Sequence, residues 1–263
     1  MNIFFRELKA NAKALIIWSI CMFLFVLSGM GKYTAYSSGA NNDIFNKMPH
    51  TIKALFGFGA FDVTSMSGFF AFLFSYIVLT TAIHAALIGS GIIAKEERDK
   101  TTEFLMVKPV SRITIINAKF IAALINVIII NLVTLASSIA MVRVYNKGKD
   151  ISHEIILFFI SMFIVQLIFL SLGAMLSAVM KKSKASGSYV TSILLGSYVV
   201  SKVTDLTDKV NALNVLSPFK YFSYENIVRG ENLNFVIVIL SLVLIAIFSA
   251  STYFFYLKRD LKV

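Results

Sequence analysis

The chain of 263 residues is 57% hydrophobic and has a mean hydropathy of +0.79, whereas a soluble domain is usually about 45–50% apolar. Its formal net charge is +11, but the bases stand at the ends of long apolar runs instead of forming one stripe, which argues against nucleic-acid binding. The single cysteine, Cys21, excludes a disulfide framework. Apolar runs of roughly 20 residues can cross a hydrocarbon core about 30 Å thick, so the composition predicts an integral membrane protein.

The N-terminal segment, residues 3–13, has the periodicity of a helix with one apolar side and one basic side. These two sides are formed by Phe4 and Leu8 and by Arg6, Lys9 and Lys13. The pattern predicts an amphipathic helix that lies in the membrane interface, and the alternative is that the segment extends the first span. Because the segment lacks the features of a signal peptide, we expect the first apolar run to stay as an anchor.

Six apolar stretches are predicted to cross the membrane as helices, since a lone span can satisfy its backbone polar groups in lipid only in this form. They cover about residues 14–30, 67–94, 113–142, 155–180, 189–203 and 235–257. The fifth is short and rich in Ser and Gly. The sequence therefore predicts one all-α, multi-pass membrane domain over residues 1–263.

The distribution of Lys and Arg predicts how the domain is oriented. With both termini inside, the cytoplasmic segments hold 15 of these bases and the outer segments hold 10. The acids are divided into six inside and eight outside. Because Lys and Arg accumulate on the cytoplasmic side of membrane proteins, both termini and residues 95–112 are predicted to lie in the cytoplasm.

Two outer segments, 32–66 and 204–232, are longer than simple turns. In the second, Pro218 stands directly before a cluster of aromatic residues, namely Phe219, Tyr221, Phe222 and Tyr224. Such residues suit the level of the lipid headgroups. We therefore expect a short re-entrant segment before the last span, with its aromatic residues serving as interface anchors and not as a ligand site.

Motifs for nucleotide or metal chemistry fail on their context. Gly89 and Gly91 end an apolar run, and the chain contains no GxxxxGK[ST] sequence, so close helix packing is the better interpretation. Glu96-Glu97 would begin an EExxxR protease motif, but its last position holds Thr101. The three histidines are too scattered to predict a metal site. The chain itself is therefore predicted to bind no cofactor and to catalyse no reaction.

A few polar residues fall inside the predicted spans: His84, Asn126, Asn131 and Gln166. An ionisable or polar side chain at this depth is a functional candidate, so we assign His84, Asn126 and Gln166 to a possible substrate path. The alternative is that each makes a hydrogen bond to a neighbouring helix. Because no series of acids crosses the membrane, the energy for transport would have to come from outside this chain.

The most charged stretch, KEERDKTTEFLMVKPVSR, covers residues 95–112 and has an internal order. Acids and bases come first, and the apolar residues Phe104–Val107 follow. Pro109 cannot continue a helix, and Ser111 can cap the next one. From these residues alone, the apolar part could either bury itself in the membrane interface or dock onto a soluble protein.

This stretch resembles the cytoplasmic loop between the second and third spans of permease subunits in the type-2 exporter class of ATP-binding cassette transporters. Their pattern has two acids, a Thr, a Glu, two Leu-like residues, Pro-Val-Ser-Arg and a later Lys. It is matched here by Glu96, Glu97, Thr101, Glu103, Leu105, Met106, Pro109, Val110, Ser111, Arg112 and Lys119. Lys100 stands where the pattern has a glycine.

The resemblance implies a coupling helix over about residues 96–108 that fits a groove on a separate ATPase subunit. Phe104, Leu105, Met106 and Val107 would form its apolar anchor, and the flanking charges would set the choice of partner. It also implies two copies of the ATPase, which bind ATP and Mg, and a second copy of this permease or a related permease.

The sequence therefore predicts an exporter permease in a bacterial plasma membrane that contacts lipid and binds no nucleic acid. Its cargo would be hydrophobic or amphipathic, such as an antimicrobial peptide, a drug or a lipid-like molecule. The alternative is a polytopic membrane protein without a transport role, such as an assembly factor, or a channel.

Overall fold

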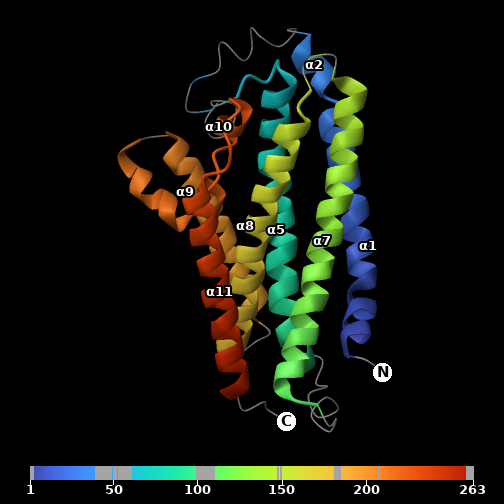
Figure 1. Ribbon diagram of the computed structural model, residues 1–263, viewed down its shortest axis with the longest axis vertical. Coiled ribbons are helices and arrows are strands. Elements are labelled where there is room, and N and C mark those ends of the chain that lie inside the picture. The colour runs from blue at the N-terminus through green and yellow to red at the C-terminus, as the bar shows by residue number, and fades with distance from the viewer. Residues whose placement is uncertain are drawn as a thin grey trace.

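The computed structural model describes residues 3–38, 49, 52, 61–98, 110–146, 148, 150–180, 185–206 and 208–258, and for residues 96–98 and 208–209 the backbone only. The described residues form helices and connecting turns (Figure 1). The long helices are α1 (Ile3–Met30), α5 (Met66–Arg98), α7 (Arg112–Tyr145), α8 (Ser152–Val179), α9 (Ser186–Leu206) and α11 (Phe235–Lys258). The short ones are α2 (Tyr33–Ser37), η2 (Asp208–Leu216), η3 (Pro218–Lys220) and α10 (Tyr224–Val228).

Five of the described helical segments are long and apolar enough to cross a membrane. They are Ile3–Ser37, Met66–Lys95, Arg112–Tyr145, Ser152–Val179 and Phe235–Lys258. The predicted all-helical membrane fold is thus confirmed, whereas the count of six spans is not. The fifth predicted span forms α9, a helix of 21 residues, but its Ser and Gly residues and the charges of Lys202 and Asp205 lower its hydropathy.

Helix α1 is continuous from Ile3 to Met30, which agrees with the alternative in which residues 3–13 extend the first span. No Pro or Gly interrupts these residues before Gly29, so nothing in the sequence stops the helix. Its 28 residues extend about 42 Å, more than the hydrocarbon core requires. That the first turns lie in the membrane interface stays a prediction.

The helices form one bundle in which α5 and α8 lie at the centre. Helix α1 packs mainly along α7 and only lightly against α5, while α11 packs on α8 (Figure 1). The ends of α5 and α11 and the starts of α1 and α7 lie together at the lower end of the bundle in Figure 1, which we call the base. The opposite end, where α2 and α10 lie, we call the outer end.

Close contact between α5 and α8 depends on two glycines. A Cβ atom at Gly89 would lie 2.1 Å from the carbonyl oxygen of Leu170, and one at Gly173 would lie 2.5 Å from that of Ala86. Each helix therefore contributes a glycine at which the backbone of the other approaches, as small residues allow in membrane bundles. Towards the outer end, Phe70, Phe74 and Phe158 fill the space between the same two helices, with ring centroids 5.0–5.8 Å apart.

The segment between α9 and α11 folds back onto the bundle. The Ser217 hydroxyl donates to the Ser197 carbonyl at 2.8 Å, and the Tyr221 hydroxyl donates to the Val215 carbonyl at 2.8 Å. Of the predicted interface anchors, Phe219 and Phe222 are instead buried. The Tyr224 ring packs edge-on against Phe74 and Phe158, at a centroid distance of 5.5 Å from each.

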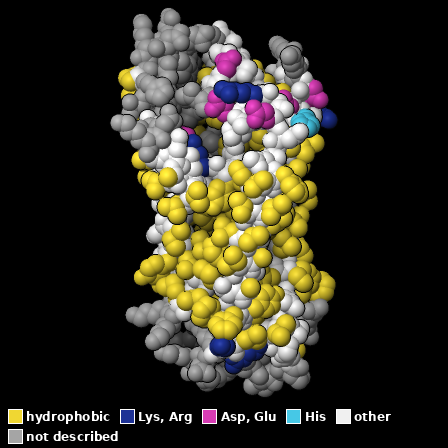
Figure 2. Space-filling view, turned by 60° about the vertical axis from the view of Figure 1, so that its left-hand side comes forward, with side chains coloured by type: hydrophobic (Ala, Val, Ile, Leu, Met, Phe, Trp, Pro, Cys, Tyr) yellow, Lys and Arg dark blue, Asp and Glu magenta, His cyan; other side chains and the backbone are white. Residues whose placement is uncertain are grey.

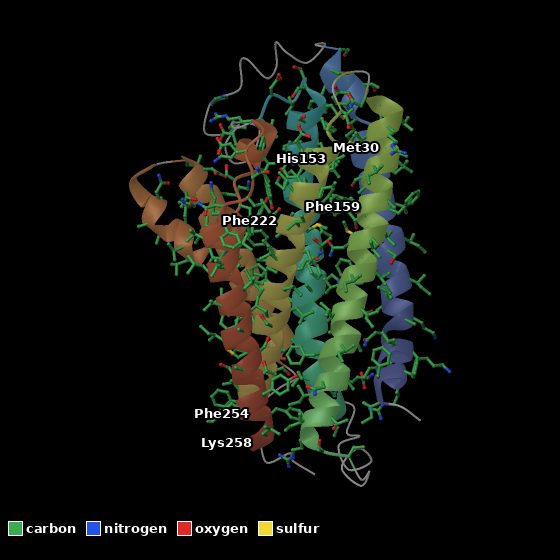
Figure 3. The ribbon with its side chains drawn as sticks, in the orientation of Figure 1. Met30, His153, Phe159, Phe222, Phe254 and Lys258 are labelled. Carbon is green, nitrogen blue, oxygen red and sulfur yellow. The ribbon has the colours of Figure 1, made fainter. Side chains whose placement is uncertain are left out.

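A belt of apolar side chains covers the middle of the face shown in Figure 2, and the charged side chains visible there lie near the two ends. Figure 3 places Phe254 and Lys258 at the base and His153 in the outer half. The Lys258 ammonium lies 3.9 Å from the centroid of the Phe254 ring. At the start of α8, Asp150 accepts hydrogen bonds from the hydroxyl and amide of Ser152, which hold the pKa of its carboxyl below the usual range.

The glycine contact predicts how two substitutions on α5 will differ. Gly89→Ala forces a methyl group into the α8 backbone, so we expect it to lower the midpoint of thermal unfolding by about 5 °C or more. The matched control is Gly91→Ala, because a Cβ atom there meets nothing within 4 Å and alanine favours the helix. Both midpoints can be measured by size-exclusion chromatography of heated, detergent-solubilised protein. Equal midpoints would contradict the close packing.

Candidate functional site at the base of the bundle

The predicted coupling helix lies almost entirely outside the described residues. Its first residues, Glu96 and Glu97, continue α5 as far as Arg98, and their side chains are not described. The remaining predicted positions, outside the described residues, are Thr101, Glu103, Phe104, Leu105, Met106, Val107 and Pro109. The structure describes the two flanks of this segment, at the end of α5 and at the start of α7.

On the α5 flank, a buried carboxylate joins α1 to α5. Glu7 is 0% exposed, and its Oε2 atom lies 3.3 Å from Lys95 Nζ. The other oxygen, Oε1, lies 3.2 Å from Arg6 Nη2. An ionised carboxylate buried away from water is stable only when it is paired in this way. Glu7 therefore holds the first turns of α1 against the last turns of α5.

A second buried charge joins α7 to the same part of α5. Lys119 is 0% exposed, and its ammonium group donates a hydrogen bond to the carbonyl oxygen of Ile92, one turn before Lys95. This is the Lys that follows Pro-Val-Ser-Arg in the sequence pattern. Two helices thus fix the end of α5 through two buried charged side chains.

On the α7 flank, Ser111 caps the helix as predicted, because its hydroxyl accepts from the Thr114 amide at 3.2 Å. Arg112 donates to the carbonyl of Leu257 on α11 at 3.1 Å. One turn further along α7, Asn117 accepts from the hydroxyl of Tyr253, also on α11, at 2.5 Å. The start of α7 is therefore anchored to α11.

We call these contacts the base frame, defined by Glu7, Lys95, Lys119, Ile92, Arg112, Leu257, Asn117 and Tyr253. The base frame joins the end of α5 to α1 and α7, and it joins the start of α7 to α11. Through these contacts, the described end of α5 and the described start of α7 are joined to each other and to α1 and α11.

The three residues predicted for a substrate path are buried, at 4% exposure for His84, 1% for Asn126 and 0% for Gln166. The structure brings two of them together, since His84 and Asn126 line the same cavity. Gln166 instead accepts a hydrogen bond from Asn131, which joins α7 to α8. The His84 ring lies 5.2 Å from the Trp18 ring, and its Nδ1 atom has no hydrogen-bond partner among the described residues.

The cavity is a slot of about 230 Å³ between α1 and α5, with Asn126 of α7 beside it. It extends from Lys95 and Asn11 near the base to His84 and Trp18 deeper in the bundle. Among the described residues, no group of His, Cys, Asp and Glu is arranged to hold a metal ion.

Glu7 and Trp18 are two residues of this region that the sequence did not predict. Glu7 is the one acid in the basic segment 3–13, which could have marked it as a candidate. The periodicity of bases and apolar residues, however, does not show which polar side chain is buried. Trp18 gave no signal, since an aromatic residue in an apolar run is ordinary.

The fold and base define a multi-pass helical membrane protein whose sequence has a charged stretch between the second and third candidate membrane-crossing helices. A comparison with protein families matches residues 1–261 to the family described as ABC-2 family transporter protein. The chain therefore belongs to the ABC-2 transporter family, in agreement with the resemblance that residues 95–119 indicate. A comparison with curated proteins finds no match.

The Asn131–Gln166 hydrogen bond predicts non-additive mutations. Asn131→Leu or Gln166→Leu alone leaves a buried amide without its partner on the other helix, whereas the double substitution removes both amides. We expect each single change to destabilise the protein by about 1 kcal/mol and the double change to cost less than the sum. Reversible unfolding in mixed detergent micelles can measure the three values.

The matched control cycle is Asn126→Leu with Gln166→Leu. Asn126 donates to the carbonyl of Ala122 in its own helix at 2.7 Å, so its effect should add to that of Gln166→Leu. Additive effects in the Asn131 cycle as well would show that the interhelical hydrogen bond contributes nothing.

Proposed function

We propose that the chain is the permease subunit of an ATP-driven exporter and that residues 96–109 dock onto a separate ATPase subunit. The observation that carries this proposal is the base frame, which anchors both flanks of the segment through buried or interhelical polar contacts. Membership of the ABC-2 family supports the same role, because the membrane component of these transporters typically lacks the nucleotide-binding domain.

ATP and Mg would bind to the partner ATPase, and this chain would catalyse no step itself. Two ATPase copies would act on two permeases, the second being another copy of this chain or a related permease. Apolar side chains on the outside of α1 and α11, such as Ile17 at 61% exposure and Leu240 at 60%, leave surface for that second permease and for lipid.

The base would face the cytoplasm of a bacterial plasma membrane, in accordance with the excess of Lys and Arg predicted on that side. Closure of the ATPases would then move α5 and α7 through the base frame and open a path towards the outer end. The cargo would be hydrophobic or amphipathic, and His84, Asn126 and Gln166 are the polar residues at membrane depth that are proposed to meet it.

The alternative function, an assembly factor or a channel, predicts that no ATPase copurifies with the protein. A channel also needs recurrent polar residues along its pore. Copurification of the chain with an ATPase that carries a Walker motif would favour the exporter.

The docking role predicts the effect of charge in the apolar part of the segment. Phe104→Asp together with Leu105→Asp should abolish the stimulation of ATP turnover by the permease, because two carboxylates cannot enter an apolar groove without loss of their hydration. ATP turnover and cargo export should be measured in proteoliposomes that contain the permease and its ATPase.

The control is Val215→Asp, which adds a charge to an apolar residue of η2 that is 73% exposed and lies outside the base frame. It should leave both activities unchanged. ATP turnover that is insensitive to the double substitution, in a variant that remains monodisperse, would refute the docking role.

A further inference from the structure

The slot between α1 and α5 opens on the outside of the bundle. Because α1 packs mainly on α7, its side towards α5 is only partly filled. Leu87 on the rim is 41% exposed, whereas His84 and Asn126 are nearly covered and add little to the wall. The wall is apolar along Leu15, Trp18, Leu87 and Ile88, and polar at Asn11 and Lys95 near the mouth and at His84 and Asn126.

The mouth of the slot is cationic. Lys95 lines it, and the cluster of Arg6, Glu7 and Lys95 carries a net charge of +1. The Lys95 ammonium group has three donor hydrogens, of which Glu7 accepts one, and its side chain is 22% exposed. A ligand at the mouth can therefore accept a hydrogen bond from the Lys95 ammonium group, which keeps donor hydrogens besides the one that Glu7 accepts.

The mouth lies at the level of lipid headgroups. The segment Met66–Lys95 has 30 residues and extends about 45 Å, so Lys95 stands at the end of a helix that is longer than the hydrocarbon core. The slot extends from there to His84 and Trp18 deeper in the bundle, and its volume of about 230 Å³ exceeds the ~150 Å³ of a cavity that accommodates benzene.

We propose that this slot binds an anionic phospholipid of the leaflet on the base side. Its phosphate group would contact Lys95 and Arg6, and one acyl chain would lie along Leu15, Trp18 and Ile88. Cationic pockets between membrane helices bind acidic headgroups through charge attraction. An anionic phospholipid supplies both the anion for the mouth and the acyl chain for the apolar wall. The proposal does not depend on the ATPase or on the direction of transport.

The protein contains its own reporter, since Trp18 is the one tryptophan in the chain. Phospholipids with brominated acyl chains quench tryptophan fluorescence on contact. The full chain is placed in nanodiscs that contain equal mole fractions of brominated phosphatidylglycerol or brominated phosphatidylcholine in an unbrominated background. We expect the anionic lipid to quench Trp18 more strongly, in proportion to its preference for the slot.

Two substitutions should change this preference in opposite directions. Lys95→Gln removes a cation from the mouth and should lower the preference about fivefold, whereas Glu7→Gln removes the competing anion and should raise it by a similar factor. The matched control, Lys13→Gln, removes an exposed cation that does not line the slot and should have a smaller effect. A loss of structure would instead shift both variants the same way.

Should either single variant fail to fold, the double variant Glu7→Gln with Lys95→Gln keeps the net charge of the cluster at +1 and should retain a preference for phosphatidylglycerol. Equal quenching by the two lipids in the wild-type protein would overturn the proposal. So would a preference that survives Lys95→Gln unchanged. Selective quenching by a brominated free fatty acid alone would assign the slot to a soluble amphipath and would also overturn it.

Discussion

The base of this bundle depends on the pairing of one buried carboxylate. Glu7 is covered completely, and a charge of this kind without a partner costs several kcal/mol because the protein interior solvates it poorly. Arg6 of the same helix and Lys95 of α5 both pair with Glu7, and the pair with Lys95 exists only while α1 stays next to α5. The light apolar packing between these two helices is thereby supplemented by an electrostatic contact at the end where they approach the charged segment.

The two ends of the bundle are stabilised by different interactions, aromatic packing at the outer end and polar contacts at the base. At the outer end, aromatic rings from α5, α8 and α10 interlock, so the helices there resist separation by many small contacts. At the base, a few directed bonds join α5 to α1 and α7, and α7 to α11. Directed bonds fix geometry at single points, so a displacement at the end of α5 or the start of α7 would act on the particular helices that these bonds join.

The sequence was sufficient for features that depend on local composition. Helix ends fell within a few residues of the predicted spans for α5, α7 and α11, and the cap at Ser111 was correct because capping needs only neighbouring residues. The sequence was insufficient where the position of a side chain depends on a residue of another helix. The neighbouring sequence does not show that the Glu7 side chain is buried while that of Lys9 is exposed. Nor does it show that Gln166 accepts a hydrogen bond from Asn131 and does not line the cavity of His84.

The polar groups inside the membrane-crossing helices also bear on how cargo could cross. Most of the buried hydroxyls bond to carbonyls three or four residues earlier in their own helix, as Thr81, Thr134 and Ser171 do. The hydrogen of such a hydroxyl is already donated to a backbone carbonyl, so the side chain has no donor left for a polar solute. Within the described part of one chain, cavities are found beside α1 and, at the outer end, between Tyr33 of α2 and Tyr145 of α7. His84 Nδ1 and Gln166 Nε2, in contrast, have no hydrogen-bond partner among the described residues, so a cargo path that uses polar groups at this depth would have to reach them.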